Sequence, residues 1–259
     1  MFEFLRRKHH VARPIFEPLG IDIHCHLVPS VDDGSKSEEE TVACLSVMRD
    51  AGFHKVICTP HFQYPRYPNE EEDIKQRFAM LRSGIVKQGG VEGIELVGIG
   101  GEYRVDSGFP ARMEAGKFLL VGGKYLLCEF SLHQQVMGLD EALFDLQMKG
   151  YEIILAHPER YPYYSANSSR LEHFKEMGIY FQINALSLSG FYGDSPRSKA
   201  FDMVEKGWVE FIGTDMHNTL YAHALLDATY DHKIEKMLAH HTFMNNELLN
   251  IDATPSAKF

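Results

Sequence analysis

Apolar and polar positions alternate along this chain in a repeating order: an amphipathic stretch with helical spacing, a glycine, then a short apolar run. The clearest copies read MRDAGFHKVIC, LQMKGYEIILA, FKEMGIYFQIN and VEKGWVEFIG. A glycine suits the position after a helix because the chain often turns there through the left-handed conformation. Helix followed by strand, repeated, predicts parallel strands joined by helical crossovers.

This pattern predicts seven strands, at about residues 20–26, 55–59, 94–100, 124–130, 151–156, 179–184 and 208–214. It predicts helices at about residues 36–51, 69–88, 137–149, 168–177 and 195–206, and further helices after His217. The first helix shows the expected terminal residues: Ser35 or Ser37 as N-cap, acidic residues in the first turn, and Gly52 at its end.

Seven such strands favour an α/β fold in the form of a seven-stranded (β/α) barrel, a distorted relative of the TIM barrel. An open doubly wound sheet is the alternative. No low-complexity segment or linker divides residues 20–250. We therefore expect one domain over residues 20–259, preceded by a basic, proline-containing N-terminal extension over residues 1–19.

Candidate metal ligands stand at the ends of nearly all the predicted strands. They are His24, His26, His61, Glu102, Glu129, His157, Asp215 and His217. Because the carboxyl ends of barrel strands meet at one mouth, these side chains are expected to form one polynuclear site. His24 and His26 share one face of their strand, as do Asp215 and His217. Only the strand ending in Asn184 lacks such a ligand.

Each of these residues also has an ordinary explanation when taken alone. Asp32 and Asp33 could serve a turn before Gly34, or supply a hard oxygen ligand. Glu102 and Glu129 could pair with Arg104 or a lysine, because a buried carboxylate needs a partner. The metal-site interpretation is favoured because it explains all of the positions together.

The types of candidate ligand limit which metal ions the site could bind. Imidazole nitrogens and carboxylate oxygens without thiolates suit Mn, Fe or Zn and argue against a structural zinc site.

The four cysteines form no CxxC pair, which favours buried free thiols and a reducing, cytoplasmic setting. A thiol-based tyrosine phosphatase needs an arginine six residues after its cysteine. That position holds Val31, Asp50, Tyr64 and Gln134.

Charge and hydropathy exclude several partners. The formal net charge of −10 argues against a nucleic-acid backbone as the main partner. No apolar run approaches the roughly 20 residues of a membrane span. The start, MFEFLRRKHH, lacks the apolar core and cleavage site of a signal peptide. The oligomeric state is left open.

The motifs DIHCH, TPH, GGEYR, CEFS, AHPER and TDMHN resemble, in this order, the polymerase-and-histidinol-phosphatase (PHP) superfamily. Within it the chain is similar, over about residues 21–250, to the bacterial manganese-dependent protein-tyrosine phosphatases of capsule and exopolysaccharide operons. This resemblance implies the PHP barrel and a metal-dependent protein-tyrosine phosphatase. Its substrate would be a phosphotyrosine protein, such as a bacterial tyrosine kinase of polysaccharide biosynthesis.

The resemblance also implies three divalent metal ions, with manganese first and iron or zinc as alternatives. The first would be held by His24, His26, Glu102 and Asp215; the second by Glu102, Glu129 and His157; the third by Asp33, His61 and His217. Arg160 would grip the phosphate, because its fork geometry suits phosphate oxygens. The alternative for Arg160 is a surface salt bridge with Glu159 or Glu152.

The chain departs from the family pattern at two places. A second arginine is expected shortly after TDMHN, and Ala222 lies near that place. Basic residues are expected directly after TPH, where only Arg66 could contact substrate.

Other functions remain open at this stage. They are a histidinol-phosphate or other small-molecule phosphatase, a nuclease of the same superfamily, and a catalytically silent metal-binding scaffold. A tyrosine phosphatase needs aromatic side chains around its mouth. The candidates are Phe62, Tyr64, Tyr67, Tyr161, Tyr163, Phe191 and Tyr192.

Overall fold

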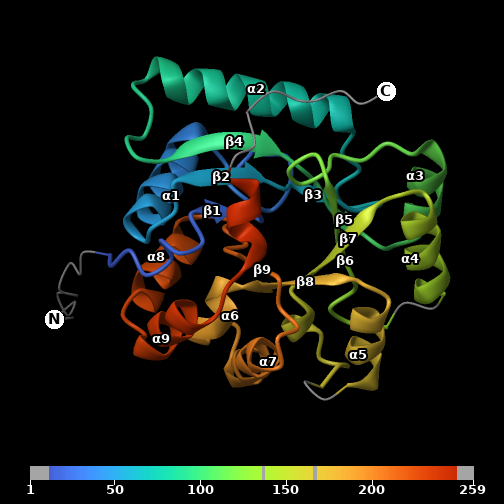
Figure 1. Cartoon of the computed structure of the whole chain (residues 1–259). Helices are drawn as coiled ribbons and strands as arrows, with labels where there is room; N and C mark the ends of the chain where they lie inside the picture. Colours follow the sequence, from blue (N-terminus) through green and yellow to red (C-terminus); the bar gives the residue numbers. More distant parts are fainter. Residues whose placement is uncertain (1–11, 136–137, 166–167, 250–259) are drawn as a thin grey trace, which may run out of the picture.

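Parallel strands in two sheets form the centre of the molecule (Figure 1). The computed structural model describes residues 12–135, 138–165 and 168–249. The first sheet has the order β1-β2-β4, with β1 Ile21–Asp22, β2 Lys55–Cys58 and β4 Glu95–Ile99. The second has the order β3-β5-β6-β7-β8-β9, with β3 His61–Phe62, β5 Glu102–Arg104, β6 Tyr125–Glu129, β7 Glu152–Ala156, β8 Tyr180–Asn184 and β9 Phe211–Gly213.

The two sheets are joined where the chain passes from β2 to β3 and from β4 to β5. Pro60 interrupts the first passage because proline has no backbone N–H. The Gly100 N–H still donates to the Cys58 carbonyl at 2.8 Å, and the Glu102 N–H donates to the Pro60 carbonyl at 3.0 Å. Hydrogen bonding between the neighbouring strands therefore continues across the junction of the two sheets.

The first predicted strand, at residues 20–26, is shorter than expected, because only Ile21–Asp22 pair as a regular strand. The residues that follow bond instead to the segment after β9. The His26 N–H donates to the Met216 carbonyl and the Asp215 N–H to the His24 carbonyl, both at 2.8 Å. The α/β class and its parallel strands are confirmed, whereas the strands of the described residues form two sheets and not one closed seven-stranded barrel.

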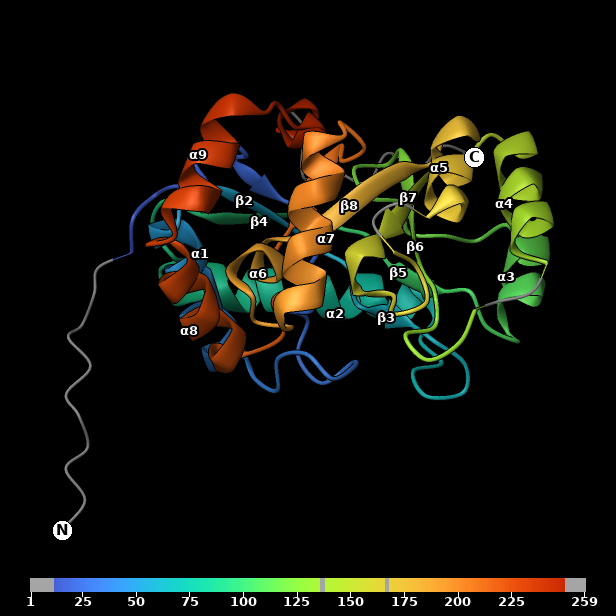
Figure 2. The same cartoon turned by 90° about the horizontal axis from the view of Figure 1, so that it is seen from below.

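Helices surround the sheets on the outside (Figures 1 and 2). They are α1 Glu38–Asp50, α2 Glu71–Lys87, α3 Phe109–Ala115, α4 Leu139–Met148, α5 Ser169–Glu176, α6 Ala185–Ser189, α7 Asp194–Glu205, α8 Thr219–Ala228 and α9 His232–His240. Two 3₁₀ turns, η1 Pro158–Arg160 and η2 Met244–Leu248, complete the described elements. The five predicted helices are all present, although the start predicted at residue 137 lies outside the described residues. Helices α3 and α6 were not predicted.

The local sequence rules explain how these helices begin and end. Ser37, rather than Ser35, caps α1 and accepts a hydrogen bond from the Glu40 N–H at 3.3 Å. Glycines end α1, α4, α5 and α7 in the left-handed region, with φ values of 112°, 87°, 79° and 68° for Gly52, Gly150, Gly178 and Gly207.

Part of the predicted N-terminal extension packs into the core. Phe16 and Leu19 are fully buried, and the Phe16 ring stacks on Phe53 with centroids 5.5 Å apart. The basic start at residues 1–11 and the tail at 250–259 lie outside the described residues. Within the described residues, no helix is both long and apolar enough to cross a membrane.

Candidate metal centre

The ends of the strands bring the predicted ligands together in one buried cluster. Four sets of three residues have potential ligand atoms that all lie within 4.8 Å of one another. They are His24, His26 and Asp215; His24, Glu102 and His157; His61, Glu102 and Glu129; and His26, His61 and His217. The sets share members, so the side chains form a continuous centre rather than separate sites.

The distances around His24 and His26 fit a shared metal ion. Two atoms bound to one ion at about 2.1 Å lie about 3.0–3.4 Å apart at octahedral or tetrahedral angles. The Nε2 atoms of His24 and His26 are 3.3 Å apart, and His24 Nε2 is 3.3 Å from Glu102 Oε1. Asp215 Oδ1 lies 3.3 Å from His26 Nε2 and 3.6 Å from His24 Nε2.

The remaining ligand candidates extend this geometry on both sides. His157 Nε2 is 3.1 Å from Glu102 Oε1 and 3.6 Å from Glu129 Oε1. His61 Nδ1 lies 2.8 Å from Glu102 Oε2, yet neither atom has a hydrogen-bond partner. Buried polar atoms in close approach without a hydrogen bond are costly. A cation between them would satisfy both, so the residues present fit a group of divalent metal ions.

Asp33 and Asp32 are placed differently relative to the cluster. Asp33 Oδ1 is buried without a hydrogen bond and lies 3.5 Å from His61 Nε2 and 3.8 Å from His217 Nε2. Asp32 Oδ2 instead lies 2.8 Å from His26 Nδ1, on the far side of that ring, and accepts from the His61 N–H at 2.9 Å. Asp33 therefore faces the centre, while Asp32 orients His26 from behind.

The backbone at the centre adopts unusual conformations. His157 and Asp215 have φ values of 35° and 54°, in the left-handed region that non-glycine residues rarely occupy. Such conformations persist where the surrounding structure determines them, and they cluster at functional sites. A Cβ atom on Gly213 would lie 2.6 Å from the His24 Cβ, so β9 approaches this histidine closely only because residue 213 is glycine.

Two buried amides that the sequence analysis did not select support the ligands from β8. Gln182 Oε1 lies 2.7 Å from His24 Nδ1, and Asn184 Nδ2 donates to Asp215 Oδ2 at 2.7 Å. The alternation of side chains along the strand could have indicated them, because Gln182 and Asn184 share the face that meets the mouth. Amides are poor metal ligands compared with histidine, so their residue type alone does not indicate a place at a metal site.

Arg160 points into the cluster and not toward Glu152 or Glu159, and Glu159 is itself buried. Its NH1 group donates to Asp215 Oδ2 at 2.8 Å, and its guanidinium carbon lies 4.2 Å from the centre of the Tyr192 ring. The Tyr192 hydroxyl is itself 3.3 Å from Asp215 Oδ2. The alternative pairing of Arg160 with Glu159 or Glu152 is therefore wrong.

Two further arginines border the centre. Arg104 donates to Glu129 Oε2 at 2.6 Å, so the expected structural pairing of Glu129 is present beside its contact with His157. Arg66 is largely exposed at the rim, with NH2 3.7 Å from Asp33 Oδ2 and its guanidinium over the Tyr67 ring.

The aromatic residues expected at the mouth divide into core and rim. Phe62 and Tyr161 are buried in the core, so neither is exposed at the mouth. Tyr64 is 60% exposed, and Tyr67 stacks on His61 with centroids 5.6 Å apart. Tyr221, which the sequence analysis did not select, lies beside the buried Ala222 and 4.9 Å from the His217 ring.

The charges of the cluster stabilise one another. Burial opposes a charged imidazole, but the carboxylates of Glu102 and Asp215 raise the pKa of His24 to about 9. Burial likewise opposes ionisation of Glu102, yet His24 and His61 hold its pKa well below its usual range. The carboxylates are thus charged at neutral pH, as oxygen ligands of a metal ion must be.

The cysteines take no part in this chemistry. Cys25, Cys44, Cys58 and Cys128 are free and buried. Burial raises the pKa of Cys44 to about 12 and that of Cys128 above its usual range. These thiols are therefore protonated at neutral pH and unsuited to nucleophilic attack.

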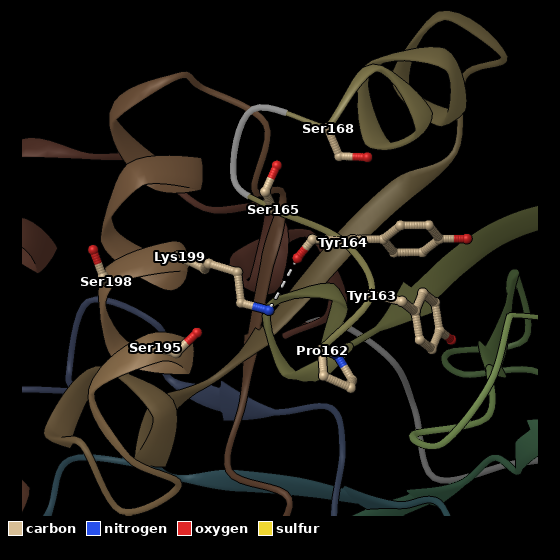
Figure 3. A pocket seen from close by; sticks show the side chains of 8 residues that line it. All are labelled: Pro162, Tyr163, Tyr164, Ser165, Ser168, Ser195, Ser198 and Lys199. Carbon is tan, nitrogen blue, oxygen red and sulfur yellow. Dashed lines mark hydrogen bonds between the residues drawn. The ribbon is translucent and has the colours of Figure 1, made fainter.

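Two cavities flank the centre without containing its ligands. One, of about 510 Å³, is lined by Pro162, Tyr163, Tyr164, Ser165, Ser168, Ser195, Ser198 and Lys199 (Figure 3). There the Lys199 ammonium donates to the carbonyls of Tyr161 and Tyr164 at 2.7 and 3.2 Å, which fixes the segment after Arg160. The other, of about 200 Å³, is lined by Phe62, Tyr64, Pro68, Glu70, Arg104, Asp106, Gly108, Phe109 and Arg112.

A comparison with protein families identifies the chain. The model of the capsular polysaccharide synthesis family CpsB/CapC matches residues 20–250. The chain belongs to this family. The resemblance to the bacterial tyrosine-phosphatase branch is thereby confirmed.

Two relatives within this family carry an assigned activity. The tyrosine-protein phosphatase YwqE of Bacillus subtilis (strain 168) is 31% identical over 200 residues, covering 76% of this chain and 77% of YwqE. The tyrosine-protein phosphatase CpsB of Streptococcus pneumoniae is 30% identical over 217 residues, covering 82% of this chain and 88% of CpsB.

Solved structures agree with this assignment. A structure reported with YwqE from Bacillus subtilis and CpsB from Streptococcus pneumoniae, described as metal-dependent tyrosine phosphatases, matches with a TM-score of 0.73 and 27% identity. The match covers 90% of this chain and 95% of the chain in that structure. A histidinol phosphate phosphatase from Lactococcus lactis shares the fold alone, with a TM-score of 0.52, 13% identity, and coverage of 86% and 95%.

Proposed function

We propose that this protein is a metal-dependent protein-tyrosine phosphatase, a phosphoric monoester hydrolase. The observation that carries the proposal is the buried cluster at the strand ends, whose histidine and carboxylate atoms have the mutual spacing of atoms around shared ions. The family model matches residues 20–250, which contain all of these side chains, and the relatives YwqE and CpsB are tyrosine-protein phosphatases.

Three divalent ions, with manganese favoured and iron or zinc as alternatives, would occupy the cluster. His24, His26, Glu102 and Asp215 would hold the first; Glu102, Glu129 and His157 the second; Asp33, His61 and His217 the third. The nitrogen and carboxylate donors, without a thiolate, support this choice of metal. Bound there, such ions supply positive charge to the phosphate and lower the pKa of water, which makes a nucleophile available at neutral pH.

The chain's own residues would orient and bind the substrate. Arg160 is held over Tyr192 and beside Asp215, so its remaining donors can bind the phosphate oxygens and stabilise charge as it develops. Arg66 lies at the rim, where it can contact the polypeptide that carries the phosphotyrosine. A phenolate leaving group has a pKa of about 10 and needs less protonation than an alkoxide, so we assign no general acid.

The wider setting belongs to the same proposal. The two sheets and the hydrogen bonds from residues 24–26 to residues 214–216 would together act as one distorted seven-stranded PHP barrel. Residues 20–259 would form one phosphatase domain, with the extension over residues 1–19 packed on it in part. We place the protein in the cytoplasm, with a bacterial tyrosine kinase or another phosphotyrosine protein of polysaccharide biosynthesis as substrate.

Metal removal tests the function directly. Treatment with a chelator should abolish hydrolysis of an aryl phosphate and of a phosphotyrosyl peptide, and Mn²⁺ should restore both. Asp215→Asn should lose activity while keeping the circular dichroism spectrum of the folded protein. Full turnover by protein that metal analysis shows to be free of divalent ions would refute the proposal.

A further inference from the structure

Strand β8 supplies no candidate ligand, yet its two buried amides contact ligands on either side. Gln182 and Asn184 are fully buried and two residues apart, so both side chains lie on the same face of the strand. The first amide contacts His24, which follows β1, and the second contacts Asp215, which follows β9. The strand therefore lies against two ligand candidates from opposite ends of the chain.

The orientation of the Gln182 amide follows from its partners. Its Nε2 group donates to the Ile183 carbonyl at 2.7 Å and to Asn184 Oδ1 at 2.9 Å. Both amide hydrogens are thus used, and the oxygen must face His24 Nδ1 at 2.7 Å. An amide oxygen only accepts, so His24 carries its hydrogen on Nδ1. When Nε2 is deprotonated, as metal binding requires, its lone pair faces Glu102 and Asp215.

The orientation of the Asn184 amide is also fixed by its partners. Its oxygen accepts from Gln182, so its nitrogen donates to Asp215 Oδ2 at 2.7 Å. The other carboxylate oxygen of Asp215, Oδ1, then faces His26 Nε2 at 3.3 Å. The Asn184 backbone N–H donates to Glu159 Oε1 at 2.9 Å, which fixes the end of β8. Turning either amide over would break the contacts at both of its ends.

We propose that the hydrogen-bonded relay His24–Gln182–Asn184–Asp215 positions two ligands of one metal ion and thereby sets the affinity of that ion. Gln182 and Asn184 are positioning residues, because they act through His24 and Asp215. The inference rests on the proposed function, since it concerns the same metal centre. Partners behind metal ligands fix ring orientation and tautomer, and their loss typically lowers metal affinity by about 10- to 100-fold.

Direct measurement of Mn²⁺ binding tests the relay without any substrate. The isosteric variants Gln182→Met and Asn184→Leu should each weaken Mn²⁺ binding about 10- to 100-fold in competition with a chelating indicator. Both residues act through one relay. The Mn²⁺ affinity of the double variant should therefore be little lower than that of the single variant with the lower affinity. Gln182→Glu keeps an acceptor toward His24 but cannot donate to Asn184. Its Mn²⁺ affinity should therefore fall less than that of Gln182→Met.

Asn245→Leu provides the matched control. Asn245 is also a fully buried amide, and it joins β1 to β9 through the Ile21 and Ile212 carbonyls at 3.0 and 2.8 Å. It contacts no ligand candidate, so its loss should lower the melting temperature while the Mn²⁺ affinity stays within about twofold of that of the wild-type protein. If Gln182→Met does not fold, Asn184→Leu and Gln182→Glu still test the relay.

Failure of the proposed function and failure of the relay would give different results. Wild-type protein that binds no divalent ion would overturn the proposed function. Wild-type affinity in folded Gln182→Met and Asn184→Leu, or an equal loss in Asn245→Leu, would overturn the relay and leave the proposed function standing.

Discussion

Arg160 is held by two contacts that a surface arginine lacks. Its guanidinium lies against the face of Tyr192 and donates to Asp215, with only 19% of the side chain exposed. Burial opposes the charge, but Asp215 raises the pKa of Arg160 above its usual range, so the positive charge is permanent. A fixed positive charge beside a metal centre can stabilise a phosphate better than a mobile one, because no reorganisation is needed.

Replacing this arginine should affect catalysis far more than metal binding. We expect Arg160→Ala to lower kcat/KM for an aryl phosphate about 100-fold, the size of losing one charge-stabilising donor. Because Arg160 also donates to Asp215, the comparison is made with Mn²⁺ in excess, where the metal content should remain at the wild-type level. Arg170→Ala is the control, because Arg170 pairs with Asp140 away from the centre. Kinetics of Arg160→Ala equal to those of Arg170→Ala would contradict the assigned role.

At the scale of elements, β9 and the segment after β1 must approach closely to align His24 with Asp215. Gly213 permits this approach, since a Cβ there would meet the His24 Cβ at 2.6 Å and Gln182 Nε2 at 3.0 Å. Real Cβ atoms do not come so close, so one of the two elements would have to move.

Gly213→Ala should therefore weaken the fold and the metal centre together. We expect a loss of about 1–3 kcal/mol in the free energy of unfolding, the usual cost of overpacking a core. Mn²⁺ affinity should fall as His24 is displaced. Gly98→Ala on β4 is the control, because its added Cβ would make ordinary contacts of 3.5 Å with Ile57. Denaturant unfolding and metal titration of both variants would show whether the close approach matters.

The segment before β1 is joined to β2 by an exposed ion pair. His54 Nε2 lies 2.9 Å from Glu17 Oε1, and this contact raises the pKa of His54 above its ordinary value of 6.5. A raised histidine pKa means that the folded state binds the proton more tightly than the unfolded state does. The stabilisation is therefore complete below about pH 6.5 and is lost as the pH rises through the folded-state pKa.

NMR titration can check this pair. We expect the His54 imidazole to titrate above 6.5 in the wild-type protein and close to 6.5 in Glu17→Gln, which removes the carboxylate. The melting temperature of Glu17→Gln should also lose this part of its pH dependence. A His54 titration unchanged by Glu17→Gln would show that the pair does not form in solution.

For the whole molecule, the metal centre lies at the junction of the two sheets and beneath a rim that carries aromatic and basic side chains. Tyr64, Tyr67 and Arg66 stand on one side, and Tyr192 and Tyr221 lie near Asp215 and His217 on the other. Such side chains offer apolar surface for a phosphotyrosine ring.

This arrangement should favour phosphotyrosyl peptides over other phosphomonoesters. We expect kcat/KM for such peptides to exceed the values for histidinol phosphate and phosphoserine peptides when all are assayed at equal metal loading. The aromatic rim and the easily displaced phenolate both act in this direction. A clear preference for histidinol phosphate would replace the tyrosine-phosphatase function while leaving the metal centre in place.

The sequence by itself determined the longer elements and most of the chemistry. Four helix ends could be predicted because glycine adopts the left-handed conformation freely. They lie at Gly52, Gly150, Gly178 and Gly207. The class of parallel α/β fold followed from the order of elements, and that class places all carboxyl strand ends together. The candidate ligands could be selected from position alone because this rule is topological and needs no side-chain detail.

Only the tertiary structure decided what depends on distance between remote residues. It showed that the chain continues past the predicted strands 55–59 and 94–100 into two short strands, β3 and β5, which were not predicted and which begin a second sheet. It turned Phe62 and Tyr161 into the core, and it placed Asp33 toward the metal centre and Asp32 behind His26. It also revealed the contacts of Gln182 with His24 and of Asn184 with Asp215. An amide in a strand has no distinctive sequence pattern, and its function arises from the two ligands that packing brings within 2.7 Å.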